Sequence, residues 1–150
     1  MADRIEKQID LKASVSRVWR ALTDYREFGE WFRVALEGPF ILGEESRGHI
    51  TWPGYEHIEW RAMVTVMEPE YAFSYTWHPF AVEPQETYAD EPHTLVEFRL
   101  EPTAEGTLLT VTESGFDKLS EVRRCEAFRM NEGGWEQQMG NIQKHVEVAV

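Results

Sequence analysis

The sequence contains a single cysteine, Cys125, and no long apolar run. One cysteine excludes an intrachain disulfide and any metal site built from several cysteines. No stretch approaches the roughly 18 apolar residues that a membrane-spanning helix needs. The first six residues, Met-Ala-Asp-Arg-Ile-Glu, are charged and lack the apolar centre of a signal peptide. We therefore expect a cytoplasmic protein.

Basic residues are also scarce. Lys and Arg total 15 against 27 Asp and Glu, which gives a net charge of −12. A field of that sign repels phosphate backbones and anionic membrane surfaces. We expect neither a nucleic acid nor a membrane as a partner.

Motifs that bind metals or phosphates, or that activate a nucleophile, are missing. The five histidines are scattered, and none stands in a metal-ligand spacing. Gly133-Gly134 lacks the Lys-Ser/Thr sequel of a phosphate loop, and no serine has a Gly-x-Ser-x-Gly setting. For Cys125 we favour a buried, inert thiol before the last helix over a reactive one beside Arg123 and Arg124. We expect no metal and no cofactor, and the sequence favours a protein that is not an enzyme.

What the sequence does contain is alternation of apolar and polar residues, which predicts strands. The predicted strands are Arg4–Leu11, Val34–Phe40, Arg47–Trp52, Ile58–Met67, Tyr71–Trp77, Thr94–Glu101 and Thr107–Ser114. Short turns separate most of them, which fits antiparallel neighbours. Residues 78–92, with three prolines and several acids, predict a long loop.

Helical spacing appears in two regions. Two short helices are predicted after the first strand, with Ser14 or Ser16 and then Asp24 as their N-caps. A long helix of about Asn131–Val148 is predicted to close the chain, entered through a flexible Gly133-Gly134. Its apolar stripe has spacings of 4, 3, 4 and 3 and consists of Trp135, Met139, Ile142, Val146 and Ala149.

Together these elements predict an α+β helix-grip fold. In it a curved antiparallel sheet wraps around the long C-terminal helix, and two short helices follow the first strand. The length favours one domain over residues 1–150.

A cavity is expected between the sheet and the final helix. An aromatic row from Tyr71 to Trp77 and the neighbouring Trp60 share one face of the sheet, opposite Trp135. The expected lining residues are Trp31, Trp52, Trp60, Tyr75, Trp77, Glu113, Trp135 and Met139. Aromatic walls with a few polar groups suit a flat, apolar small molecule. A dense core without a usable cavity is the alternative.

Two residues are candidates for acid–base chemistry. Glu113 ends an inward-facing row that begins with Leu109 and Val111, so a buried carboxylate is one interpretation. The alternative is that the strand has reached the rim and Glu113 is solvated. His78, at a strand end near the expected cavity mouth, is a second proton-transfer candidate.

Four segments of the chain carry a resemblance to a known family. They are Ala13–Asp24 with Trp31-Phe32, Val66–Trp77, Gly106–Phe116 and Gly134-Trp135. In this order they resemble the activator of heat-shock-protein-90 ATPase homologue-like family, within the START-like (SRPBCC) superfamily. The chain departs from the family at Val15, where proline is usual, and in the longer, acidic 78–92 loop, which could reshape the cavity mouth.

The resemblance implies the helix-grip fold but no single activity, because similar domains include co-chaperones, carriers of hydrophobic ligands and polyketide cyclases. Our leading hypothesis is binding of a small hydrophobic ligand in the cavity, without catalysis. One alternative is a cyclase- or hydrolase-like enzyme that uses Glu113 and His78. The other is a co-chaperone-like domain that regulates a chaperone ATPase. A homodimer is a further expectation.

Overall fold

The computed structural model describes residues 4–80, 88 and 90–147. Its elements in chain order are β1 (Arg4–Leu11), α1 (Val15–Thr23), α2 (Tyr25–Phe32), β2 (Val34–Leu36), β3 (Glu45–Ile50), β4 (Glu59–Glu68), β5 (Ala72–Trp77), β6 (Thr94–Pro102), β7 (Thr107–Ser114), the short 3-10 helix η2 (Phe116–Lys118) and α3 (Glu121–Val146). The predicted succession of one strand, two short helices, six strands and a long helix is confirmed over these residues.

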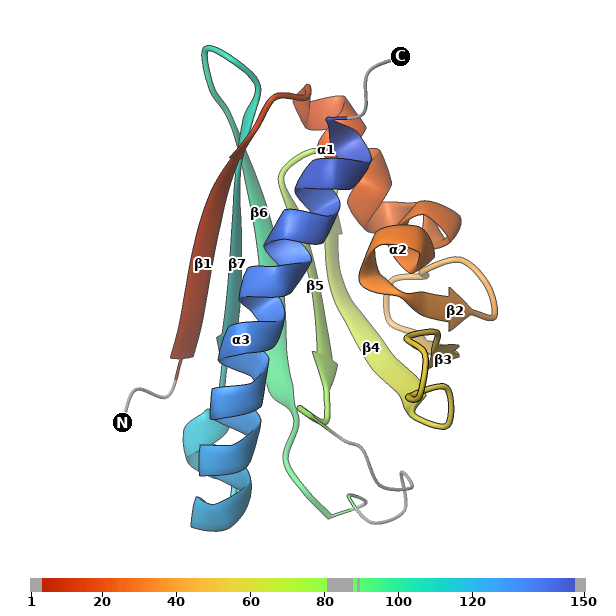
Figure 1. The fold of residues 1–150 in the computed structure, drawn as a ribbon, viewed down its shortest axis with the longest axis vertical. Coiled ribbons are helices and arrows are strands. Elements are labelled where there is room, and N and C mark those ends of the chain that lie inside the picture. The colour runs from red at the N-terminus through yellow and green to blue at the C-terminus, as the bar shows by residue number, and fades with distance from the viewer. Residues whose placement is uncertain (1–3, 81–87, 89, 148–150) are drawn as a thin grey trace.

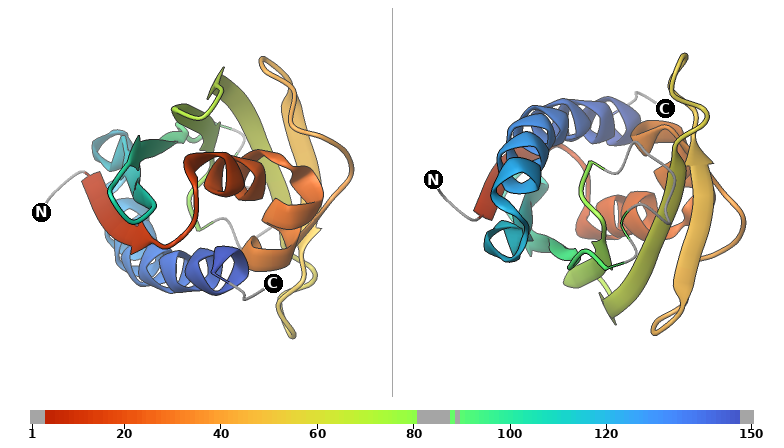
Figure 2. Two further views of the ribbon diagram at one scale, coloured as in Figure 1. Left: turned by 90° about the horizontal axis from the view of Figure 1, so that it is seen from above. Right: turned by 90° about the horizontal axis from the view of Figure 1, so that it is seen from below.

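The strands form one antiparallel sheet in the order β1-β7-β6-β5-β4-β3-β2. The sheet curves around α3, which contacts β1, and α1 and α2 pack beside α3 within the same curve (Figures 1 and 2). The first strand therefore lies beside the last one, and both meet the C-terminal helix. The α+β helix-grip fold is confirmed. No helix in the described ranges is long and apolar enough to cross a membrane.

Short-range hydrogen bonds explain why α1 and α2 begin where they do. The Ser14 hydroxyl accepts from the backbone N–H of Arg17 at 3.2 Å, and Asp24 Oδ1 accepts from that of Arg26 at 2.9 Å. Each bond satisfies a backbone donor that has no partner inside the helix. Ser14 and Asp24 are therefore N-caps, as two of the sequence signals predict.

The long helix α3 begins ten residues before its predicted start. Ser120 caps it by accepting from the backbone N–H of Arg123, and Ala127 and Phe128 pack this first part against the rest of the molecule. Gly133 and Gly134 therefore lie inside the helix, and the predicted hinge before Trp135 is wrong. Capping and packing outweigh the cost of about 1 kcal/mol for each interior glycine. Residues 148–150, which hold the end of the predicted helix and Ala149, lie outside the described residues.

Two predictions of burial are wrong. Cys125 is exposed, because it lies on the solvent side of this extension of α3. Tyr71 is 57% exposed, because the chain reverses at Glu70 with a positive φ of 63° and β5 begins only at Ala72. The inward aromatic row is thus Phe73, Tyr75 and Trp77. The predicted 78–92 loop falls largely on residues 81–87 and 89, outside the described part of the chain.

A cluster of charges joins α1, α2 and α3 at the other end of the molecule from Cys125. The carboxylate of Glu27 accepts from Arg17 at 2.6 Å, from Arg20 at 2.8 Å and lies 2.9 Å from His145 Nε2. Burial of Glu27 works against its ionisation, but the hydrogen bonds from His145 and Arg17 outweigh it and lower the pKa of Glu27 below its ordinary value of 4.5.

The lowered pKa of Glu27 gives a pH-dependent stability. Because the folded pKa lies below the unfolded one, this stabilisation is present above pH 4.5 and is lost as the pH falls through the folded pKa. We expect Glu27→Gln to lower the free energy of unfolding by about 1 kcal/mol at pH 7 and by progressively less below pH 4.5. Urea denaturation at pH 7 and at about pH 3 measures this loss of stability, with a substitution of an exposed residue of α3, Glu136→Gln, as the control. A deficit that stays constant down to pH 3 would contradict the assignment.

Candidate ligand-binding site

Glu113 lies on the inner face of β7. Leu109, Val111 and Glu113 alternate toward α3, and all three are fully buried. The predicted inward row is therefore confirmed, and the alternative of a solvated Glu113 at the rim is wrong.

Four side chains donate hydrogen bonds to the Glu113 carboxylate. Oε2 accepts from Trp77 Nε1 at 2.8 Å and from Thr94 Oγ1 at 2.5 Å. Oε1 accepts from Asn131 Nδ2 at 2.9 Å and from Trp135 Nε1 at 2.8 Å. A buried carboxylate is costly without partners, and here four neutral donors replace its lost hydration.

The register of the sheet brings these donors together. Trp77 on β5 pairs with Thr94 on β6, and Glu113 on β7 pairs with Val96, two residues after Thr94 on the same strand. Asn131 and Trp135 are four residues apart, so they lie on the same face of α3. The network therefore ties three adjacent strands to the long helix.

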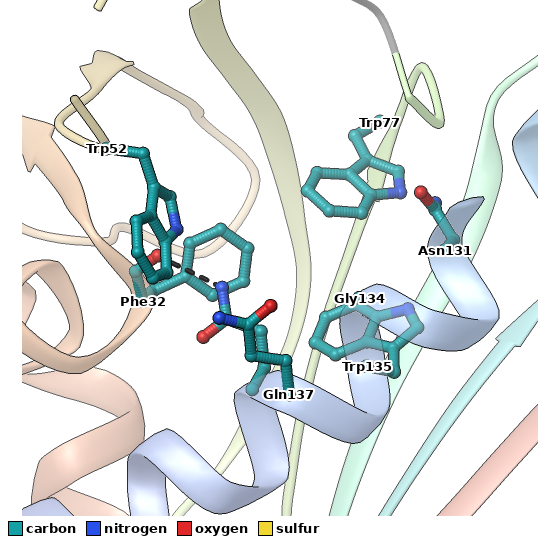
Figure 3. A pocket seen from close by; sticks show the side chains of 8 residues that line it. Phe32, Trp52, Trp77, Asn131, Gly134, Trp135 and Gln137 are labelled. Atoms are coloured by element: carbon teal, nitrogen blue, oxygen red, sulfur yellow. Dashed lines mark hydrogen bonds between the residues drawn. The ribbon is translucent and has the colours of Figure 1, made fainter. Parts of the chain in front are cut away.

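An open cavity of about 170 Å³ lies beside this network (Figure 3). It is lined by Phe32, Trp52, Trp77, Asn131, Gly134, Trp135, Gln137 and Gln138. Four aromatic rings supply its apolar surface, and three amide side chains supply its polar groups. Gln138 Nε2 donates to the carbonyl oxygen of Phe32 at 3.0 Å, which ties α3 to the end of α2 in the cavity wall.

A second cavity of about 170 Å³ shares Phe32, Trp77 and Asn131 with the first. The rest of its lining is mixed, with apolar side chains and the ionisable groups of Glu59, Arg61 and His78. The two cavities therefore share part of their walls, and Trp77 lines both of them.

The structure divides the predicted lining residues into three groups. Trp52, Trp77 and Trp135 line the first cavity, and Trp60 lines the second. Trp31, Tyr75 and Met139 are buried core residues that line neither. Glu113 lies behind the wall, bonded to three residues that form it: Trp77, Asn131 and Trp135.

The buried tryptophans outside the first cavity make ordinary core contacts. Trp31 Nε1 donates to the carbonyl oxygen of Ala21 at 2.8 Å, and Trp60 Nε1 donates to Ser46 Oγ at 3.0 Å. The ring of Tyr75 packs against Trp60 at 5.3 Å and Trp77 at 5.4 Å. Dense packing, the predicted alternative to a cavity, thus describes the surroundings of Trp31 and Tyr75, whereas Trp60 also lines the second cavity.

His78 belongs to a separate polar cluster at the end of β5. Its ring meets that of His93 at 4.3 Å, and burial, followed by the nearby His93, lowers the pKa of His78. Arg123 of α3 donates to Glu91 from Nε and Nη2 at 2.8 Å each and to the carbonyl oxygen of Pro79 at 2.6 Å. His78 lines the second cavity, whereas Glu113 lines neither of the two cavities described above.

Several residues of the site escape sequence reasoning. Thr94 and Asn131 complete the Glu113 network. The unpredicted residues of the first cavity wall are Phe32, Asn131, Gly134, Gln137 and Gln138. The available signal was the i, i+4 spacing of Asn131 and Trp135, which places an amide beside an expected cavity residue. In the part of the chain that the structure describes, no three His, Cys, Asp or Glu side chains are grouped so as to hold a metal.

Residues 12–147 match a family model described as Activator of Hsp90 ATPase homolog 1-like protein. The chain belongs to this family. The match covers nearly the whole sequence, so the resemblance drawn from four separate segments is confirmed. No curated protein is matched by the sequence.

Solved structures extend the comparison of this family member to its fold. Protein MLL2253 from Mesorhizobium loti is 23% identical, with a TM-score of 0.75 and 96% of each chain covered. The Aha1 dimer from Colwellia psychrerythraea is 18% identical, with a TM-score of 0.71 over 99% of this chain and 98% of that one. DynU16, a protein in the dynemicin biosynthetic locus, is 22% identical, with a TM-score of 0.75 over 99% of this chain and 48% of DynU16. At these identities the likeness concerns the fold alone.

Proposed function

We propose that this protein binds a small, flat, apolar molecule in the cavity between the sheet and α3, without catalysing its conversion. The observation that carries the proposal is the composition of the cavity wall: four aromatic rings and three amides around an open volume of about 170 Å³. Ligand sites are typically concave and apolar with a few polar groups that fix orientation. A cavity of about 150 Å³ is large enough for benzene, so one or two fused rings match this space.

The Glu113 network supports binding because it fixes two walls of the cavity. Each indole N–H of Trp77 and Trp135 is held at 2.8 Å by the same carboxylate. Side chains that are already ordered lose little conformational entropy when a ligand arrives. We therefore assign Glu113 a positioning role.

An acid–base role for Glu113 has less support from the geometry. Its two oxygens already accept four hydrogen bonds, and the side chain has no exposed surface through which it could meet a substrate. A general acid or base must reach the proton that it transfers within hydrogen-bond distance. The predicted homodimer and chaperone partner rest on the family resemblance, and the contacts described above add nothing to either.

Trp52 offers the cleanest test of the binding proposal, because it lines the cavity without belonging to the buried core. We expect Trp52→Ala to weaken binding of the neutral bicyclic probe 1-aminonaphthalene roughly tenfold, through loss of one aromatic wall. The free energy of unfolding should change by less than about 1 kcal/mol. Energy transfer from tryptophan to the probe reports binding, and thermal denaturation reports stability.

The matched control is Tyr71→Ala, which removes an aromatic ring that is 57% exposed and lines neither cavity. Its probe affinity should equal that of the unaltered protein. Equal probe affinity of the Trp52→Ala and Tyr71→Ala proteins, or no probe binding at all, would contradict the proposal. If Trp52→Ala alone weakens probe binding, native mass spectrometry of the protein purified from its own host would identify the natural ligand.

A further inference from the structure

The negative charge of Glu113 has no cationic partner in the described ranges 4–80, 88 and 90–147. Its four hydrogen-bond donors are two indoles, one hydroxyl and one amide, and all of them are neutral. None of the ion pairs of the described residues includes it. Because the side chain is fully buried, solvent screens this charge poorly.

The charge lies directly behind the first cavity. Three of its four donors, Trp77, Asn131 and Trp135, are also cavity-lining residues, so one layer of side chains separates the carboxylate from the open space. Figure 3 shows the indole nitrogens of Trp77 and Trp135 on the side of Asn131, away from Trp52 and Phe32. Burial, followed by the nearby Glu113, raises the pKa of the buried Tyr75 well above the usual range.

Among the described residues, the wall of the first cavity contains no Lys, Arg or His. It presents the rings of Phe32, Trp52, Trp77 and Trp135, whose faces carry partial negative charge and attract cations. Arg33 lies 5.1 Å from the centroid of the Trp52 ring, so one of these rings already accommodates a delocalised cation. Arg33 is exposed, and solvent therefore screens its own charge from the cavity.

We infer that the cavity selects planar aromatic cations over neutral molecules of the same shape, and that it rejects carboxylates. This inference rests on the proposed function and names its ligand class. A delocalised or quaternary nitrogen is weakly hydrated and loses little on entering an aromatic site, whereas a primary ammonium would need three hydrogen-bond acceptors. The aromatic rings hold the plane of the ligand, and the buried carboxylate of Glu113 favours its positive charge.

Three bicyclic probes of nearly equal shape test this selection: N-methylquinolinium, 1-methylnaphthalene and 1-naphthoate. Titrations followed by NMR on the indole N–H signals of Trp77 and Trp135 give the three dissociation constants. We expect N-methylquinolinium to bind roughly tenfold tighter than 1-methylnaphthalene, and 1-naphthoate to bind weakest. The cation preference should persist in about 0.5 M salt, because high salt screens surface charges but not a buried one.

The variant Glu113→Gln measures how much the Glu113 carboxylate contributes to the preference for the cation. In folded Glu113→Gln protein the preference for the cation should fall below roughly threefold. If that variant does not fold, the salt dependence of the unaltered protein carries the test alone. Equal binding of N-methylquinolinium and 1-methylnaphthalene, or a preference that disappears in high salt, would overturn the inference and leave the proposed function standing. Failure of all three probes to bind would overturn both.

Discussion

Replacing Glu113 by glutamine is expected to lower the free energy of unfolding by roughly 2–3 kcal/mol. The carboxylate accepts from Trp77, Thr94, Asn131 and Trp135. The Thr94 hydroxyl and a flipped Asn131 amide can accept a hydrogen bond instead, but the two indole N–H groups, which bind different oxygens, cannot. A glutamine side chain supplies one acceptor oxygen and an NH₂ group. At least one indole N–H would then face another donor inside the core, which costs the full desolvation of that group.

Thr94→Val is the matched comparison for this experiment. It removes one donor from the same carboxylate, keeps the shape of the side chain, and leaves three hydrogen bonds in place. We expect it to cost about 1–2 kcal/mol. Urea denaturation of both variants measures the difference. If Glu113→Gln costs no more than Thr94→Val, the carboxylate does not hold the sheet to α3, and its positioning role is wrong.

The elements of this fold can be predicted from sequence because burial leaves a periodic record. The rows Leu109, Val111, Glu113 and Trp135, Met139, Ile142 face the same interior from β7 and α3, and their spacings of two and of three to four follow from strand and helix geometry. The start of α3 left no such record, since half of the residues from Glu121 to Met130 are charged and more than half are exposed. Its helix depends on the Ser120 cap and on packing of Ala127, which only the folded molecule shows.

The candidate site is harder to predict for a related reason. The alternation of side chains along β7 identifies Glu113 as inward-facing, but it does not say which donors bind the carboxylate. Trp77 and Asn131 are separated from Glu113 by 36 and 18 residues in the sequence. Nor does this alternation distinguish residues that line the cavity from residues of the core. Tyr75 and Trp77 share a face of β5, yet only Trp77 lines the first cavity. Trp77, at the end of β5, lies near Phe32 of α2 and Trp135 of α3, whereas Tyr75 is fully buried, and only the three-dimensional arrangement shows this difference.

Filling the first cavity from α3 should abolish binding without harming the fold. Gly134 lines that cavity, and a Cβ atom added there would meet nothing within 4 Å. A leucine at this position would place its side chain on the cavity-lining side of α3, where it would compete with the ligand for space. Replacing a glycine inside a helix also favours the helix by up to about 1 kcal/mol.

The most direct measurement compares Gly134→Leu with Gly133→Leu in titrations with 1-aminonaphthalene. Gly133 also lies inside α3, and a Cβ atom added to it would likewise meet nothing within 4 Å, but it does not line the cavity. We expect both variants to be at least as stable as the unaltered protein, with probe affinity reduced more than roughly tenfold by Gly134→Leu alone. Equal probe affinity in the two variants would contradict the assignment of this cavity as the ligand site.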